Sequence, residues 1–566
     1  MLGRVRPGRR DRHDGWPRIL LLLVMCIWPA GAFAQPAPIR PPTSSDDGLT
    51  ALLAPLPDAT FADKEQLVDQ IAATGHPGAR TVLVAFLEDR LFFRGADKRV
   101  FVVASNDDAL TSFALFDPAS QQPAGQIPKD DLTKIGTNNR LRRVLKISIA
   151  RFDLGSSEAS VRLAAVQTLL GSIDAETIAL LEGRATREQD PAIRREVETG
   201  LALSALDGED RAARVRAVET LSSRLSADVR NRLSALTDKT EAGEFVEPDA
   251  EVRSAAARAV QAIDYKRTMY SGVEMLFFGL SLGSVLVLIA IGLAITFGVM
   301  GVINMAHGEL MMLGAYTTYV VQTLMPAHIG ASILAAIPAA FLVSAVVGIL
   351  IERTVIRFLY GRPLETLLAT FGVSLVLQQG VRSMFSALNR AVETPAWMSG
   401  TLQVNEALSI TYNRIYIILF AAIVFVLLQM VLRLTRLGLD IRAVSQNRTM
   451  ARAMGVRSDW VDAMTFGLGS GIAGVAGVAL SQLTNVGPNL GQSYIIDSFM
   501  VVVFGGVGNL WGALIGGMSM GIVNKLLEPY AGAVLAKILV LIALILFIQR
   551  RPRGLFPQTG RAAENQ

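Results

Sequence analysis

The chain is poor in the residues that metal, disulfide and nucleotide sites require. It has one cysteine among 566 residues, and its four histidines are scattered along the sequence. Neither an H-E-x-x-H pattern nor a G-x-x-x-x-G-K-[ST] pattern occurs. We therefore expect no metal site, no catalytic residues and no cofactor held by this chain, and we do not expect it to be an enzyme.

The single cysteine lies in an early apolar run, "ILLLLVMCIW" (19–28), that follows the pattern of a secretory signal peptide. Arginines precede the run, and Ala32 and Ala34 after it form an A-x-A cleavage site. The run is shorter than the roughly 20 residues that a membrane span needs. We predict a signal peptide over residues 1–34, with an uncleaved anchor as the alternative.

Charged residues are also scarce along most of the second half of the chain. Residues 36–272 are mixed and charged, whereas residues 273–549 are nearly all apolar with short polar breaks. The second composition is typical of a membrane domain. The net charge is +5, but the arginines flank apolar blocks, as the positive-inside rule predicts, so we expect no nucleic-acid partner.

The first half is predicted to be a mainly helical domain over residues 49–268, after a proline-rich linker over 35–48. Four stretches there combine an acidic start, an arginine and an alanine/leucine face at helical spacing: 156–173, 190–206, 210–225 and 249–263. They resemble HEAT-type helical repeats, with an ordinary helical bundle as the alternative. Between about 92 and 135, β-branched and aromatic residues indicate a short hairpin or inserted sheet.

The second half contains nine apolar blocks, and several are short enough to be broken or re-entrant. The blocks cover about 275–297, 309–325, 330–351, 364–380, 413–432, 460–480, 494–507, 511–526 and 531–549. We predict an all-α fold whose polytopic membrane domain has about 8–9 crossings or half-helices. Arginine-rich loops at 352–363 and 433–457 should be cytoplasmic, as should the tail 558–566, while the helical domain should be extracytoplasmic.

Five stretches of the membrane half match one known family, in order. They are "SLGSVLVLIAIGLAITFGVMGVINMAHGELMMLGAY" (281–316), "RAVSQNRTMARAMGV" (442–456), "GIAGVAGVAL" (471–480), "VVVFGGVGNLWGALIGG" (501–517) and "RPRGLF" (551–556). Residues 270–557 thereby resemble the permeases of ABC transporters in the branched-chain amino acid and urea group. Stretches at 362–379, 506–517 and 524–556 look most like the urea permease, and a long N-terminal extension also fits that branch.

The resemblance implies a transport complex in the inner membrane of a bacterium. Its expected partners are a second permease subunit, two ATPase subunits that bind the ATP, an extracytoplasmic solute-binding protein and membrane lipid. The N-terminal domain would be periplasmic and the C-terminus cytoplasmic.

The loop 433–457 corresponds to the segment that touches the ATPase in this family. Its candidate coupling residues are Arg442, Met450, Ala451, Met454 and Gly455. A short helix with small and flexible apolar residues can seat in a groove of a partner. The alternative is a positive loop that only fixes the topology.

Polar residues inside apolar blocks are the candidates for the substrate path, because each is costly in lipid. The candidates are Asn304, His307, Glu309, Glu365, Thr366, Thr370 and Asn509. The first three lie at a predicted helix break, where they could equally hold the exposed backbone. Glu365 is near a helix end and could simply extend to the surface, and Asn509 follows a glycine-rich break.

The function expected from the resemblance is that of a permease subunit of an ATP-driven importer for urea, serving nitrogen uptake. The alternatives are a permease for branched-chain or other amino acids, a passive urea or amide channel, and a membrane anchor that only recruits partners.

Overall fold

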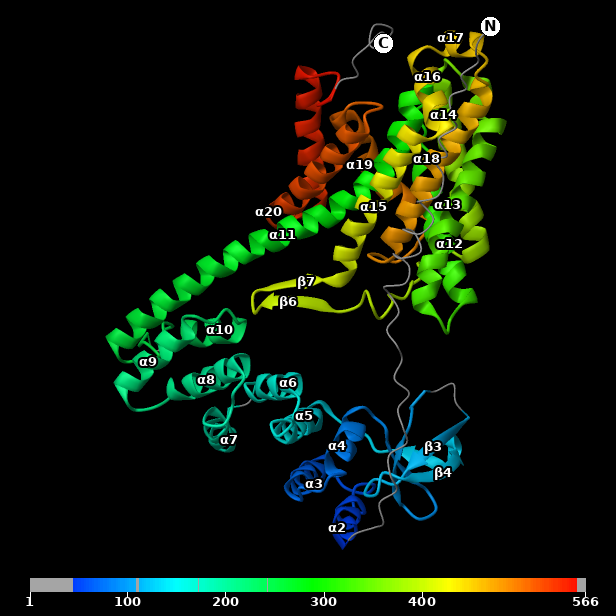
Figure 1. The fold of residues 1–566 in the computed structure, drawn as a ribbon. Coiled ribbons are helices and arrows are strands. Elements are labelled where there is room, and N and C mark those ends of the chain that lie inside the picture. Colours follow the sequence, from blue (N-terminus) through cyan, green and yellow to red (C-terminus); the bar gives the residue numbers. More distant parts are fainter. Residues whose placement is uncertain (1–43, 108–110, 172, 242, 557–566) are drawn as a thin grey trace, which may run out of the picture. The chain divides into compact units, whose positions relative to one another are not determined.

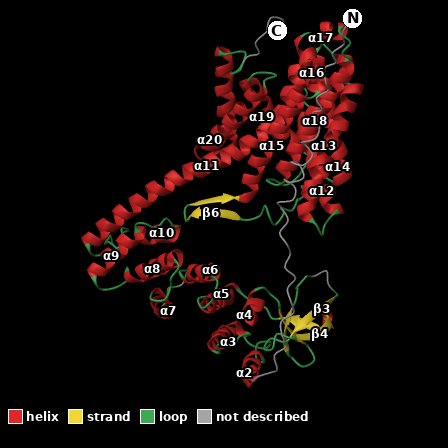
Figure 2. Ribbon diagram, viewed as in Figure 1, coloured by secondary structure: helices red, strands yellow, loops and turns green. Residues whose placement is uncertain are grey.

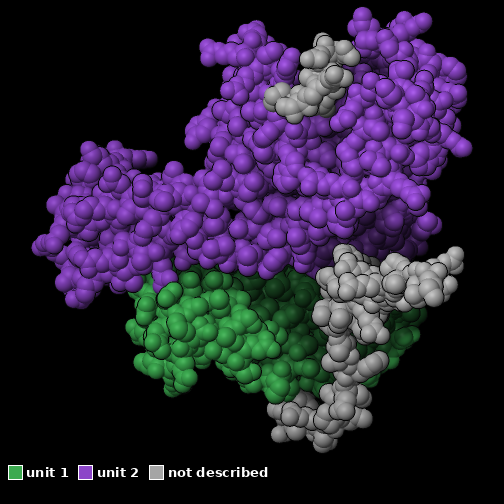
Figure 3. Space-filling model, turned by 45° about the horizontal axis from the view of Figure 1, so that its top comes forward, with its two compact units in different colours: residues 1–204 green, residues 205–566 purple. Residues whose placement is uncertain are grey.

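The computed structural model describes residues 44–107, 111–171, 173–241 and 243–556. The expected signal peptide with Ala32 and Ala34, residues 35–43 of the predicted linker and the tail 558–566 lie outside the described residues. The chain divides into two compact units, residues up to 204 and residues from 205 onward (Figure 3). This division precedes the predicted boundary at 268–270.

The first unit opens with three helices on an aliphatic core. The helices are α2 (Ser44–Leu53), α3 (Phe61–Ala73) and α4 (Ala79–Leu87). Thr60 and Asp63 form a reciprocal capping box at the start of α3, which satisfies two backbone N–H groups that the helix leaves unpaired. Leu56, Ile71 and Leu83 are fully buried between these helices.

A five-stranded antiparallel sheet follows, at the position where the sequence predicted a β insertion (Figure 2). Its strands are β1 (Leu91–Arg94), β2 (Val100–Val103), β3 (Ser112–Phe116), β4 (Pro123–Pro128) and β5 (Leu132–Lys134), in the order β4-β3-β2-β1-β5. Leu91 lies opposite Val102, and Phe93 lies opposite Val100. The prediction of an insertion is confirmed, and the fold is therefore not purely α-helical.

Four more helices carry the segments in which arginine recurs. They are α5 (Asn139–Asp153), α6 (Ala159–Leu169), α7 (Ala175–Ala185) and α8 (Pro191–Ala205). Arg162 of α6 donates to the Ser156 and Ser157 carbonyls and to both carboxylate oxygens of buried Glu188, at 2.9–3.1 Å. The predicted helices are confirmed here, while the HEAT type of repeat stays a prediction.

The second unit begins with the same arginine arrangement. Arg214 of α9 (Arg211–Leu221) donates to the Gly208 and Glu209 carbonyls at 2.9 Å and to Glu247 at 3.2 Å. The recurring arginine thus fastens the loop before its own helix and reaches a carboxylate further along the chain. α10 (Ala227–Ala235) follows, and its Arg230 makes two 2.9 Å bonds to Asp264.

A single helix, α11 (Ala250–Met300), carries the chain from these helices into the apolar half (Figure 1). It has 51 residues, and the predicted boundary at 268–270 falls inside it. Asp249 caps its start, and Gly301 ends it with a φ of +65°. No proline interrupts the sequence between its charged first half and its apolar second half, so the backbone hydrogen bonds of the helix can continue.

The apolar end of α11 holds the first apolar block, and seven later helices hold the other eight. They are α12 (His307–Leu324), α13 (Ile329–Thr354), α14 (Pro363–Phe385), α15 (Tyr412–Leu434), α18 (Ser458–Ser481), α19 (Leu490–Gly505) and α20 (Leu510–Arg550). Among the residues that the structure describes, six helices are long and apolar enough to cross a membrane. α20 holds the last two blocks and is broken at Gly532, where φ is 75° and ψ is 160°.

Close helix contacts in the membrane unit depend on facing glycines. α12, α13 and α18 pack around a core that includes Leu310 and Phe466. A Cβ atom on Gly314 of α12 would run into the backbone of Gly474 of α18. Small residues at such positions let two helix backbones approach, which is how helices associate in lipid.

A two-stranded hairpin, β6 (Thr401–Asn405) and β7 (Leu408–Thr411), precedes α15.

Candidate functional site

A helix break between α11 and α12 places three polar side chains deep in the membrane unit. Residues 301–306 are not helical, and His307 opens α12. Asn304 Oδ1 accepts the Ala306 N–H at 3.0 Å, and His307 Nε2 lies 3.0 Å from the Ile289 carbonyl oxygen. Both residues are fully buried. These contacts show that the two side chains support the backbone at the break.

Glu309 receives its partners from α14. Its Oε1 accepts hydrogen bonds from Ser374 Oγ at 3.1 Å and from Gln378 Nε2 at 2.7 Å. Only 1% of Glu309 is exposed, so this contact lies inside the helix packing. The sequence reasoning missed Ser374 and Gln378.

A polar stripe along α14 was the signal that could have found them. Thr366, Thr370, Ser374 and Gln378 recur every fourth residue, which places them on one helix face. All four are buried. Thr370 Oγ1 also accepts the Met305 N–H at 3.1 Å, so the stripe reaches the helix break.

Two predicted path residues lie apart from this cluster. Glu365 is exposed on the first turn of α14 and pairs with Arg362 at 3.2 Å. Asn509 caps the start of α20 by accepting the Trp511 and Gly512 N–H groups at 3.0 and 3.2 Å. The structure therefore brings together Asn304, His307, Glu309, Thr366 and Thr370, and leaves Glu365 and Asn509 outside.

Three buried polar atoms of this cluster have no partner among the described residues. They are Asn304 Nδ2, His307 Nδ1 and Glu309 Oε2. A buried polar atom without a partner costs about 1–3 kcal/mol, so such atoms are usually met by water, a ligand or another chain. The three belong to one short segment and offer both donor and acceptor capacity, which suits a polar solute.

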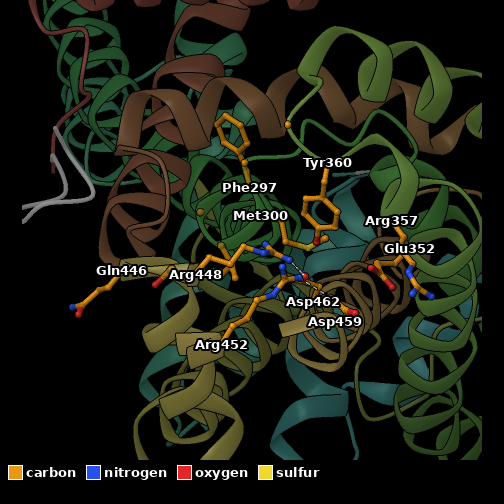
Figure 4. Close-up of a pocket in the computed structure, with 15 residues that line it drawn as sticks. Phe297, Met300, Glu352, Arg357, Tyr360, Gln446, Arg448, Arg452, Asp459 and Asp462 are labelled. Atoms are coloured by element: carbon orange, nitrogen blue, oxygen red, sulfur yellow. Dashed lines mark hydrogen bonds and ion pairs between the residues drawn. The ribbon is translucent and has the colours of Figure 1, made fainter. Parts of the chain in front are cut away.

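A cavity of about 690 Å³ lies beside the predicted coupling loop 433–457, which follows α15, and the segment that follows α13 (Figure 4). Arg448 forms an ion pair with Asp462 of α18, and its guanidinium carbon lies 4.5 Å from the centre of the Tyr360 ring. Burial, with the nearby Asp462 carboxylate, raises the pKa of the Tyr360 hydroxyl above its usual range. These contacts tie the loop that carries Arg448 to a membrane helix.

That loop consists of α16 (Arg436–Gln446) and the short helix α17 (Arg448–Ala453). Met450 and Met454 are 60% and 79% exposed, whereas Ala451 is buried against the hydrophobic cluster of Ile441, Val444 and Val461. Of the predicted apolar coupling residues, the two methionines thus form the accessible surface and Ala451 anchors it.

Two further predicted residues of the loop have backbone roles. Arg442 donates a hydrogen bond to the Leu432 carbonyl, and Gly455 has a φ of +90°, which strains any other residue.

Among the residues that the structure describes, no group of three or more His, Cys, Asp or Glu side chains is placed to hold a metal ion.

Comparison with known proteins places the apolar half in a transport family. The family described as branched-chain amino acid transport system / permease component matches residues 275–548. The branched-chain amino acid permease protein BraD of Pseudomonas aeruginosa is 31% identical over 297 residues, which cover 51% of this chain and 96% of BraD. LivH of Salmonella typhimurium is 31% identical over 294 residues, which cover 50% of this chain and 94% of LivH.

A more remote relative is the ribose import permease protein RbsC of Escherichia coli. It is 26% identical over 264 residues, which cover 45% of this chain and 77% of RbsC. No solved structure matches the chain.

Proposed function

We propose, from the premise that the chain belongs to the family of branched-chain amino acid transport permeases, that it forms part of the membrane path of an ATP-driven importer. The observation that carries this proposal is the buried polar cluster at the break between α11 and α12. Three of its atoms have no partner among the described residues, although polar groups are costly in lipid. A solute or its water shell would supply the missing partners.

The loop of α16 and α17 is the proposed contact with the ATPase subunits. Arginines flank it, and the positive-inside rule then places it in the cytoplasm together with the C-terminal end of α20. This orientation sets the helical domain that precedes α11 on the other side, where a solute-binding protein would deliver the solute. The exposed Met450 and Met454 suit a groove on a partner, because methionine adapts to irregular apolar surfaces.

The substrate that the comparisons favour is a branched-chain amino acid, because the relatives BraD and LivH carry that activity in their names. The family resemblance extends over nearly all of those proteins, since 94–96% of their length is covered. The first unit and the part of the second unit before residue 275 lie outside the matched family segment.

Urea is the second candidate substrate. The segments at 362–379, 506–517 and 524–556 resemble the urea permease, and the long N-terminal extension fits that branch. The segment 362–379 contains the stripe of Thr366, Thr370, Ser374 and Gln378, whose hydroxyl and amide groups can hydrogen-bond a small neutral solute.

Uptake of labelled leucine and labelled urea by cells that lack the chromosomal gene is the direct test. The cells receive the wild-type chain or the variant Glu309→Gln with its partner subunits. The proposal expects uptake of one of the two solutes in cells with the wild-type chain and a loss of about tenfold or more in the variant, because an amide replaces the buried carboxyl group that accepts from Ser374 and Gln378.

A Glu393→Gln variant, which alters an exposed carboxylate outside the cluster, serves as the control and should transport normally. Abolishing ATP hydrolysis in the ATPase subunits should stop uptake. Uptake that continues without ATP hydrolysis would contradict an ATP-driven importer and indicate a passive channel.

A further inference from the structure

A second cavity, of about 390 Å³, lies between α19 and the two arms of α20. The arms meet at Gly532, where α20 is broken, and the connection from α18 to α19 closes one side of the cavity. In the proposed orientation this side faces outward, because the connection 482–489 carries no charge and the whole of α18 separates it from the arginine-rich loop 433–457. Broken helices beside a cavity are a recurring feature of solute sites in transporters.

The cavity is lined by two cations and two carboxylates. Lys537 Nζ lies 2.9 Å from Asp497 Oδ2, and Lys525 forms an ion pair with Glu528. Three of these residues belong to α20, whose composition is otherwise strongly apolar. Charged residues in such a helix are expensive in lipid and usually mark a solute path or a water-filled site.

One more polar group in the cavity wall has no partner. Asn524 is 7% exposed, and its Oδ1 is buried without a hydrogen bond to any residue that the structure describes. Its carbonyl oxygen is an acceptor, which an ammonium group could meet. The wall therefore offers a free buried acceptor next to two ion pairs.

We infer that this cavity takes the charged end of a free α-amino acid. The carboxylate of the amino acid would pair with Lys537, and its ammonium group would pair with Asp497 and the Asn524 carbonyl oxygen. A zwitterion can replace the protein's own ion pair charge for charge, so the buried Asp497 keeps a cationic partner. Urea has no charge and would leave the ion pair closed.

This inference rests on the proposed importer function and names the place in the membrane unit where the charged groups of its solute would bind. It also supplies what the polar cluster at the α11–α12 break lacks, since that cluster contains no cation to meet a carboxylate. The cavity and the cluster would then handle the same solute at two places along the membrane unit.

The test measures leucine uptake by the complete complex with Asp497→Asn, Lys537→Gln and the swapped pair Asp497→Lys with Lys537→Asp. Each complex is also challenged with three unlabelled competitors. Leucine has both charged groups, leucinamide lacks the carboxylate, and 4-methylpentanoate lacks the ammonium group. We expect KM to rise about tenfold or more in each single variant, with a smaller effect on the maximal rate. Lys537→Gln should lose its discrimination against leucinamide, and Asp497→Asn its discrimination against 4-methylpentanoate.

Glu393→Gln is the matched control and should keep the wild-type KM. The swapped pair keeps an ion pair, so it reports on binding even where a single variant fails to reach the membrane. Wild-type KM and wild-type selectivity in the swapped pair would overturn the inference. Uptake of urea alone, unchanged by these variants, would overturn the inference and leave the importer function standing, whereas no uptake of either solute would contradict the importer function itself.

Discussion

Single buried charges in this protein are held by several partners at once. Glu188 is the clearest case in the first unit, because it accepts from Arg162, Arg184 and the Gln189 and Asp190 N–H groups while only 1% of its side chain is exposed. Arg162 is its leading partner, and together these contacts lower the pKa of Glu188 to about 2. The residue therefore links the loop before α8 to α6.

This pKa predicts an acid-dependent loss of stability. Because the carboxylate of Glu188 has a lower pKa in the folded chain than its ordinary value of 4.5, its contribution is present above about pH 4.5 and declines as the pH falls toward 2. The variant Glu188→Gln should lower the free energy of unfolding by about 2 kcal/mol at pH 7 and by less at pH 3. Thermal unfolding at both pH values would measure it, and an equal loss at both would contradict the role of the charge.

The arginines of this motif were visible in the sequence, but their carboxylate partners were not. The apolar spacing in the stretches around Arg162 and Arg214 predicted helices that the structure confirms, because helical periodicity is a local property. Glu188 and Glu247 lie far along the chain from these arginines, and such pairings depend on how helices stack. Ser374 and Gln378 were missed for a different reason, since uncharged polar side chains on an apolar helix stand out only when every fourth position is compared.

At the scale of elements, α17 is a short helix fixed on one side and open on the other. Ala451 packs against the hydrophobic cluster of α16 and α18, and Arg448 pairs with Asp462. Met450 and Met454 face outward. A partner that moves α17 would therefore also move α18. The sequence identified this loop correctly as a helix, but periodicity over six residues could not tell which of its apolar residues point inward.

Variants of the outward face should separate docking from folding. Met454→Glu is expected to reduce co-purification of the ATPase subunits about tenfold or more, because it places a charge in an apolar contact. Met454→Leu keeps the apolar surface and should bind normally. Normal co-purification by Met454→Glu, at equal membrane abundance, would argue against α17 as the contact.

The whole molecule contains a membrane core that is built without the first unit. The two large core clusters of the apolar half contain no buried residue before Val285. The sequence located the change from mixed to apolar composition, but it could not show that α11 crosses this change without interruption. Compact units depend on contacts between elements, and composition alone does not reveal them.

Removal of the first unit should therefore leave the second intact. A chain in which residues 1–34 are joined directly to Ala205 is expected to reach the membrane and to melt within about 3 °C of the full chain. A chain joined at Ala250 removes α9 and α10 and exposes Val252 and Ile263, which are otherwise fully buried. It should aggregate or melt earlier, as fluorescence-detected size-exclusion chromatography would show. Equal behaviour of the two chains would contradict the packing of α9 and α10 on α11.

The continuity of α11 also has a consequence for how this protein can vary. An α-helix turns by about 100° and rises by about 1.5 Å for each residue. One residue inserted between Asp264, which holds α10, and Val285, which lies in the membrane core, would swing the two ends out of phase. Natural lengths of this stretch should accordingly change in steps of about seven residues, close to two whole turns. Such a step keeps the α10-facing side and the core-facing side of α11 at the same angle to each other.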